Sequence, residues 1–253
     1  EPLRNVARIR EALRGEIARW APETELQGLR KALMAMAVDA DLVLDLHCDV
    51  EACLHFYAEE PCWPGLKPLS DLLGSEVVLL SRQAQGQSFD EALSGPWWQL
   101  AEMAQRASPA VPVPQACLSA TLELRGKTDV THELAQKDAR AIMAYLIHTG
   151  AVAGEVSAPP EPKCQPTPLA GSMAVCARSA GVVVFVAEVG SMIREGDVVA
   201  QLINPISGDV DEIRAEVEGV FYARSRERYV LAGGEIGKIA CAKPLRTGPL
   251  LGV

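Results

Sequence analysis

The sequence predicts an α/β domain followed by a small all-β domain. Helical patterns interleave with apolar runs of strand length in the first part of the chain, an order typical of layered α/β domains. The composition changes at a proline-rich stretch, and beyond it the chain is valine-rich, punctuated by glycine and without helical period. We therefore expect an α/β domain over residues 1–157, a linker over 158–168 and a β domain over 169–253.

The elements of the first part follow from apolar spacing. Apolar residues at intervals of three and four predict helices over residues 3–20 and about 24–38. The apolar run at 42–46 predicts a buried strand, and the alternation at 117–124 predicts a second strand. The capping box Ser88–Glu91 predicts the start of a helix, and Pro96 predicts the start of another. We also expect a long helix over residues 131–148 and an irregular, proline-rich stretch over residues 59–73.

The second part contains an internal repeat. Gly181 is followed by three valines and lies 15 residues before Gly196. Gly219 lies the same 15 residues before Gly234. Two copies of a strand–turn–strand unit predict a pseudo-symmetric β domain, with the glycines in tight turns.

Composition excludes several function classes. The formal net charge of -9, with no basic cluster, argues against a nucleic-acid partner. No apolar run approaches the roughly 18 residues of a membrane span. The seven cysteines are odd in number and lack a CxxC pair, which favours free thiols in a reducing cytoplasm. The sequence starts at Glu1 rather than at Met, so we expect further chain upstream.

Two polar positions are candidates for chemistry. His47 lies between Asp45 and Asp49 at the carboxyl end of the first predicted strand, where α/β sheets bind ligands. A metal ligand and a structural core histidine are both open readings. Glu123 lies within the second strand, where a carboxylate is costly unless it is paired or faces a cleft. It is either an ion-pair partner, for Arg125 for example, or a general base.

Three segments together resemble the succinylglutamate desuccinylase/aspartoacylase family of the zinc carboxypeptidase superfamily. They are residues 40–57, residues 120–130 and the helix that ends at 150–154. The resemblance implies a carboxypeptidase-like mixed sheet flanked by helices. It also implies a zinc-dependent hydrolase that cleaves the amide bond of an N-acyl amino acid or a related small molecule.

The same resemblance assigns roles to individual residues. His47 corresponds to the later histidine ligand of a single zinc ion, and Glu123 to the carboxylate that activates the zinc-bound water. Arg125 could anchor a substrate carboxylate. The partner is then a small acyl-amino-acid-like substrate, and a homo-oligomer is compatible with the family.

One part of the family pattern is missing. No His-x-x-Glu motif, which supplies the first two zinc ligands in the family, occurs in the 253 residues. We expect those ligands upstream of Glu1, so the chain by itself should bind zinc poorly and be inactive. The alternative is a metal-free relative that uses the cleft for binding only.

The β domain also resembles the barrel-sandwich hybrid of lipoyl and biotinyl carrier domains. Those domains present a modified lysine on the hairpin between their two halves. Residues 204–213, which join the halves here, contain no lysine, so we discount a carrier function.

Overall fold

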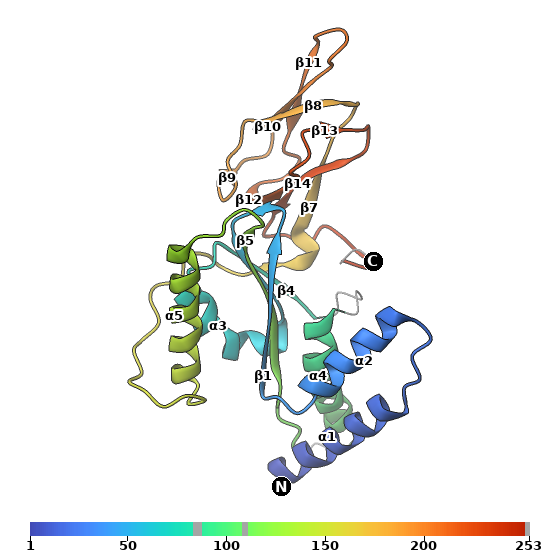
Figure 1. Ribbon diagram of the computed structural model, residues 1–253, viewed down its shortest axis with the longest axis vertical. Helices are drawn as coiled ribbons and strands as arrows, with labels where there is room; N and C mark the ends of the chain where they lie inside the picture. The colour runs from blue at the N-terminus through green and yellow to red at the C-terminus, as the bar shows by residue number, and fades with distance from the viewer. Residues whose placement is uncertain (83–87, 108–110, 251–253) are drawn as a thin grey trace. The chain divides into compact units, whose positions relative to one another are not determined.

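The computed structural model describes residues 1–82, 88–107 and 111–250 (Figure 1). A sheet with interspersed helices is followed by antiparallel β sheets. The first sheet has the strand order β1-β5-β3-β4-β6. Its strands are β1 (Leu42–Asp49), β3 (Leu54–Glu59), β4 (Val77–Ser81), β5 (Leu118–Gly126) and β6 (Thr167–Pro168). The helices are α1 (Pro2–Arg19), α2 (Glu25–Ala37), α3 (Trp63–Leu73), α4 (Phe89–Ala107), α5 (His132–His148) and the short η1 (Glu60–Cys62) and η2 (Leu169–Gly171).

Contacts divide the chain into two compact units. The first comprises Glu1–Asp45, Ala58–Leu66 and Gln87–Thr121, and the second comprises Leu46–Tyr57, Lys67–Gly86 and Leu122–Val253. The units cut across the ranges proposed above as domains, and that division at 157 and 168 remains a prediction.

The first unit is built on α1, α2 and α4. The apolar positions predicted for the first helix pack here, together with α4 and the residues before β5 (Val6, Ile9, Leu13, Leu93, Trp97 and Cys117). The side chain of Thr24 caps α2 by accepting a hydrogen bond from the backbone of Gln27. The predicted apolar face of α2 is exposed, because Leu26 and Leu29 each retain 57% of their surface.

Two expectations about prolines are wrong. Residues 63–73 form α3 with Pro68 inside it, rather than an irregular stretch. Pro96 does not open a helix but lies inside α4, which runs unbroken from Phe89. Proline in a helix removes one backbone hydrogen bond. Burial outweighs that cost in both helices, because the apolar side chains around each proline are almost fully buried (Leu66, Leu69, Leu73, Leu93 and Trp97).

The sequence patterns described above do not predict the central strands β3 and β4. Five of the six residues of β3 and four of the five residues of β4 are buried, so that both faces of each strand are covered. A strand covered on both sides has no alternation of apolar and polar residues. The pattern of apolar residues therefore predicts β1 and β5 but not β3 and β4.

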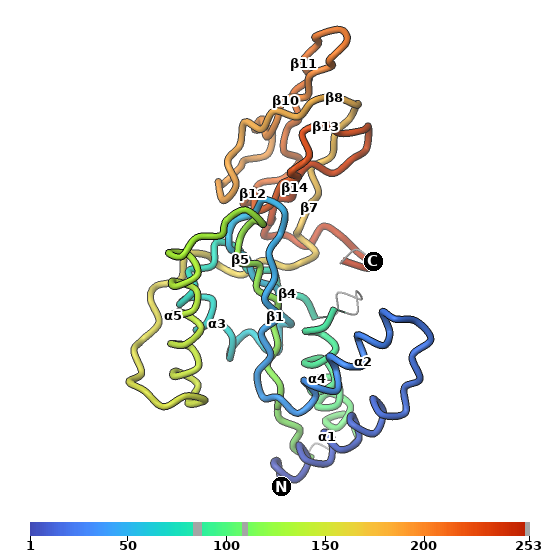
Figure 2. Tube along the Cα trace, viewed as in Figure 1, coloured from blue at the N-terminus to red at the C-terminus, as the bar shows by residue number. Residues whose placement is uncertain are grey.

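The second unit contains the β domain, with strand orders β11-β10-β8-β13 and β2-β12-β14-β7 in two sheets. The bounds are β2 (Glu51–Ala52), β7 (Ser172–Cys176), β8 (Gly181–Phe185), β9 (Met192–Ile193), β10 (Val198–Ile203), β11 (Val210–Arg214), β12 (Gly219–Arg224), β13 (Tyr229–Val230) and β14 (Glu235–Ala240). The predicted repeat is present, because β8 pairs with β10 as β12 pairs with β14 (Figure 2). Each turn between the paired strands contains a glycine with positive φ, Gly196 at 88° and Gly233 at 81°.

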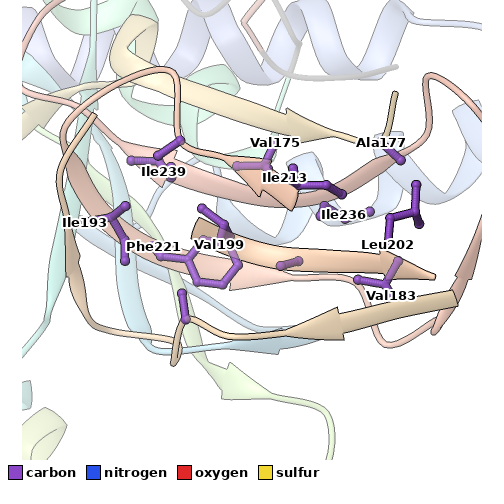
Figure 3. Packing of buried hydrophobic residues seen from close by; sticks show 13 residues of the cluster. Val175, Ala177, Val183, Ile193, Val199, Leu202, Ile213, Phe221, Ile236 and Ile239 are labelled. Atoms are coloured by element: carbon purple, nitrogen blue, oxygen red, sulfur yellow. The ribbon is translucent and has the colours of Figure 1, made fainter. Parts of the chain in front are cut away.

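The two halves of the repeat share one apolar core. Side chains from both sheets meet between them (Figure 3). Phe221 and Val199 are completely buried there, and Ile236 and Ile239 nearly so. Each half buries its apolar face against the other, which is the physical reason that the repeat occurs as a pair.

No helix among the described residues is long and apolar enough to cross a bilayer.

Candidate active site

The structure brings His47 and Glu123 together. His47 lies near the end of β1 and Glu123 near the end of β5, and these strands are neighbours in the sheet. The Nδ1 atom of His47 is 3.9 Å from Oε1 of Glu123. The Glu123 side chain is only 14% exposed, whereas that of His47 is 50% exposed. A largely buried carboxylate thus faces an imidazole that a ligand can reach from solvent.

A pocket adjoins His47, whereas Glu123 is not among the residues that line it. It has a volume of about 530 Å³ and is lined by the ends of β1 and β5 and the start of α5. His47, Arg125 and Asp138 contribute polar groups to its wall, and Leu46, Leu124 and Leu134 contribute apolar surface. Its mixture of apolar lining and a few polar groups suits a small molecule.

Arg125 is held by a partner that the sequence does not reveal. Its two terminal nitrogens donate to the carboxylate of Asp138 on α5, at 2.9 and 2.7 Å. The hydrogen bond to Asp138 is the main reason that the pKa of Arg125 is raised. Arg125 also has a φ of 72°, a strained conformation for a residue with a side chain. The pair with Asp138 orients the guanidinium beside the pocket, and any substrate carboxylate would share it with Asp138.

His55 lies in a buried cluster of aromatic and polar side chains close to the end of β1. His55 on β3 is fully buried, and its Nδ1 donates to the carbonyl of Cys53 at 2.9 Å. Its Nε2 is 3.9 Å from Oδ2 of Asp49. Burial lowers the pKa of His55 to about 4, so the ring is neutral at pH 7. The rings of Tyr57 and Tyr222 make edge-type contacts with the His55 ring, with centroids at 5.3 and 5.0 Å.

The described residues do not complete a metal site. In residues 1–82, 88–107 and 111–250, no three or more His, Cys, Asp or Glu side chains are grouped so that they could hold a metal ion. Structural and catalytic zinc sites take three or four protein ligands. His47 and Glu123 alone therefore do not fit a zinc ion.

The same fold and a related sequence occur in solved structures of known proteins. A scan against protein-family models and a search of curated proteins find no match. A protein from Shewanella amazonensis SB2B, provisionally assigned to the succinylglutamate desuccinylase/aspartoacylase family, matches 95% of this chain with a TM-score of 0.82 and 28% identity. Its counterpart from Shewanella frigidimarina NCIMB 400 matches 96% with the same TM-score and 27% identity. In fold and sequence the chain is thus similar to proteins of the succinylglutamate desuccinylase/aspartoacylase family.

The family match confirms the predicted fold class, a sheet flanked by helices followed by antiparallel β sheets. This chain spans 66% of the length of each Shewanella protein. The ectoine utilization protein EutE (DoeB) from Ruegeria pomeroyi has a fold similar to that of this chain at lower identity. Its apo structure is 14% identical with a TM-score of 0.64, covering 87% of this chain and 67% of that one. Its product-bound structure is 15% identical with a TM-score of 0.63, covering 88% and 65%.

Proposed function

We propose that this chain acts in a zinc-dependent hydrolase that cleaves the amide bond of an N-acyl amino acid or a related small molecule. The observation that supports the proposal is the placement of His47 beside Glu123, at 3.9 Å on neighbouring strands, with His47 in the wall of a pocket of about 530 Å³. The family is one of zinc amidohydrolases, and the Ruegeria pomeroyi protein has been captured with its product.

Glu123 has the properties of a general base. Its side chain is 14% exposed, so it is largely shielded from water, yet it lies 3.9 Å from His47. A carboxylate in this position can take a proton from an attacking water and return it to the nitrogen of the leaving amine. Both transfers need only Glu123 and a water within hydrogen-bond reach.

His47 would contribute one zinc ligand. Its ring is half exposed, so a nitrogen is accessible to a metal ion. The remaining ligands would have to come from outside the described residues, since these do not complete the shell. The chain alone is accordingly expected to bind zinc weakly and to show little hydrolysis.

Arg125 would contact the carboxylate of the substrate. A guanidinium has five N–H donors, and the pair with Asp138 uses one on each terminal nitrogen. The remaining donors could reach a second carboxylate in the adjoining pocket. The seven free cysteines support a reducing compartment, such as the cytoplasm, as the place of this activity.

Metal analysis combined with activity measurements tests the proposal. Zinc uptake is measured, with a family member's His-x-x-Glu segment supplied, for the wild-type protein, His47→Ala, Glu123→Gln and, as a control, His132→Ala, whose exposed ring lies at the start of α5. Hydrolysis is followed on a panel of N-acetyl and N-succinyl amino acids. We expect His47→Ala to lose zinc and the other two variants to keep it. Glu123→Gln should lower any hydrolysis by about 10²- to 10⁴-fold.

Each result has a definite reading. Zinc uptake unchanged by His47→Ala removes the metal role of His47, and hydrolysis unchanged by Glu123→Gln removes the catalytic role of Glu123. Binding of N-acyl amino acids without zinc uptake or hydrolysis, even when a family member's His-x-x-Glu segment is supplied, supports the metal-free alternative instead.

A further inference from the structure

Apolar side chains form much of the wall of the pocket beside His47. Two of them are largely exposed to solvent, Leu46 with 53% of its surface and Val130 with 83%. Leu124 and Leu134, which are half-buried, line the same pocket. Single exposed apolar side chains are common on protein surfaces, whereas several gathered around one cavity indicate a binding site.

The polar groups of the wall are largely engaged with one another. Arg125 makes its two hydrogen bonds to the carboxylate of Asp138. Oδ2 of Asp129 accepts a hydrogen bond from the backbone nitrogen of Gly126 at 2.9 Å, and the hydroxyl of Thr131 caps the start of α5. A polar group of a ligand must compete with these hydrogen bonds, whereas an apolar group only displaces water from the apolar part of the wall.

The charges of the wall also cancel. Among the described residues that line the pocket, Arg125 and Lys127 are positive and Asp129 and Asp138 are negative, so two charges of each sign leave no net charge when His47 is counted as neutral. Under the proposed function, the α-carboxylate of the substrate already uses Arg125. A second carboxylate, as in an aspartyl side chain or a succinyl group, would enter the pocket without a surplus positive charge to balance it, which is costly.

We propose that this pocket binds an apolar group of the substrate. The preferred substrates are then N-acyl amino acids with an aliphatic or aromatic group rather than with a second carboxylate. The apolar group belongs either to the amino acid side chain or to the acyl chain, since both lie close to the amide bond. The volume of about 530 Å³ leaves room for such a group, because small-molecule pockets measure roughly 300–1,000 Å³. This inference rests on the proposed function for the kind of ligand, and it adds the substrate class.

Binding of uncleaved ligands tests the inference without catalysis. N-acetyl-L-leucine, N-acetyl-L-asparagine and N-acetyl-L-aspartate have side chains of similar size that differ in polarity and charge. N-hexanoylglycine has its apolar group on the acyl side. Affinity for the whole chain is measured by NMR titration without added zinc. We expect at least one of the two apolar ligands to bind about tenfold or more tightly than the asparagine and aspartate derivatives, and the tighter of the two identifies the source of the apolar group.

Val130 can be changed with little effect on the fold, because its side chain is 83% exposed. Val130→Asn should weaken binding of the preferred apolar ligand about threefold or more, since part of the apolar wall is lost. Leu46→Asn is a second variant with the same expected direction. The matched control is Val156→Asn, at a valine that is 63% exposed and does not line the pocket. This control and Lys127→Met should change the affinity less than about twofold.

The inference is wrong if N-acetyl-L-aspartate binds as tightly as the apolar ligands, or if the wild type prefers it and Lys127→Met removes that preference. It is also wrong if neither apolar ligand binds at millimolar concentration, or if Val130→Asn and Leu46→Asn both bind as the wild type does. Circular dichroism verifies that each variant is folded. Selective binding of apolar ligands without hydrolysis, when the His-x-x-Glu segment is supplied, would contradict only the proposed function. Hydrolysis combined with unselective binding would contradict only this inference.

Discussion

Glu59 illustrates the cost of burying one carboxyl group. It ends β3, and its side chain accepts hydrogen bonds from Oγ of Ser94 at 2.6 Å and Nε1 of Trp98 at 2.9 Å. The residue is only 2% exposed. Burial raises its pKa to about 7, although both hydrogen bonds act in the opposite direction. The folded protein thus holds the proton of Glu59 more tightly than the unfolded chain does.

The raised pKa predicts a stability loss between pH 4.5 and pH 8. A carboxyl group with a higher pKa in the folded state stabilises the fold fully below its unfolded value of 4.5, and this contribution is lost as the pH rises through about 7. The loss is on the order of 3 kcal/mol for a shift of this size. Glu59→Gln has no carboxyl group to titrate and should not show this loss. Its free energy of unfolding, measured with urea, should therefore decrease less from pH 4.5 to pH 8 than that of the wild type.

The lowered pKa of His55 has the opposite effect on stability between about pH 4 and pH 6.5, but His55 is present in both proteins and its contribution cancels in the comparison. The matched control is Glu60→Gln, which alters the exposed neighbour of Glu59 and should follow the wild type. An equal decrease in the free energy of unfolding of Glu59→Gln and the wild type would show that Glu59 is not protonated in the folded state at pH 5–6.

At the scale of elements, the strand–turn–strand pairs of the β domain depend on one shared core. Phe221 on β12 is fully buried there and lies near Phe185 of β8, with ring centroids at 6.1 Å. Phe221→Ala should therefore lower the free energy of unfolding by about 3–5 kcal/mol, through lost burial and the cavity left behind.

Urea unfolding of the whole chain measures this effect. Val184→Ala on β8 is the control, because Val184 is 42% exposed on the outer face and its truncation should cost less than about 0.5 kcal/mol. Equal effects of the two substitutions would mean that the two halves of the repeat do not share a core.

Thiol accessibility reports on the fold of the whole molecule. All seven cysteines are free; Cys48 and Cys176 are exposed and Cys164 is partly exposed. The other four are buried, namely Cys53, Cys62, Cys117 and Cys241. Burial raises the pKa of several of these thiols, for example to about 12 for Cys53, so they are protonated and inert at pH 8.

A thiol reagent at pH 8 should modify Cys48 and Cys176 quickly, Cys164 slowly, and the four buried thiols only after denaturation. Cys48→Ser should remove one of the fast reactions, with mass spectrometry identifying the sites. Rapid reaction of all seven cysteines in the native protein would contradict the fold described above, and failure of any to react after denaturation would reveal disulfides.

Local patterns determined much of this architecture. The amphipathic spacing of α1, the alternation of β5 and the glycine repeat each reflect a requirement that acts within a few residues of the chain. His47 and Glu123 could also be selected as candidates, since a histidine between carboxylates and a carboxylate within a strand are both unusual locally.

Only the tertiary structure decided the rest. β3 and β4 are buried on both faces, so their sequences do not alternate between apolar and polar residues. α3 and α4 each contain a proline, whose cost is offset because the side chains around it are buried. The pairing of Arg125 with Asp138 joins β5 to α5, and the approach of His47 to Glu123 joins two strands whose residues are distant in sequence. Burial and charge pairing depend on which surfaces meet in space, so a linear sequence shows the residues that can do chemistry before it shows their partners.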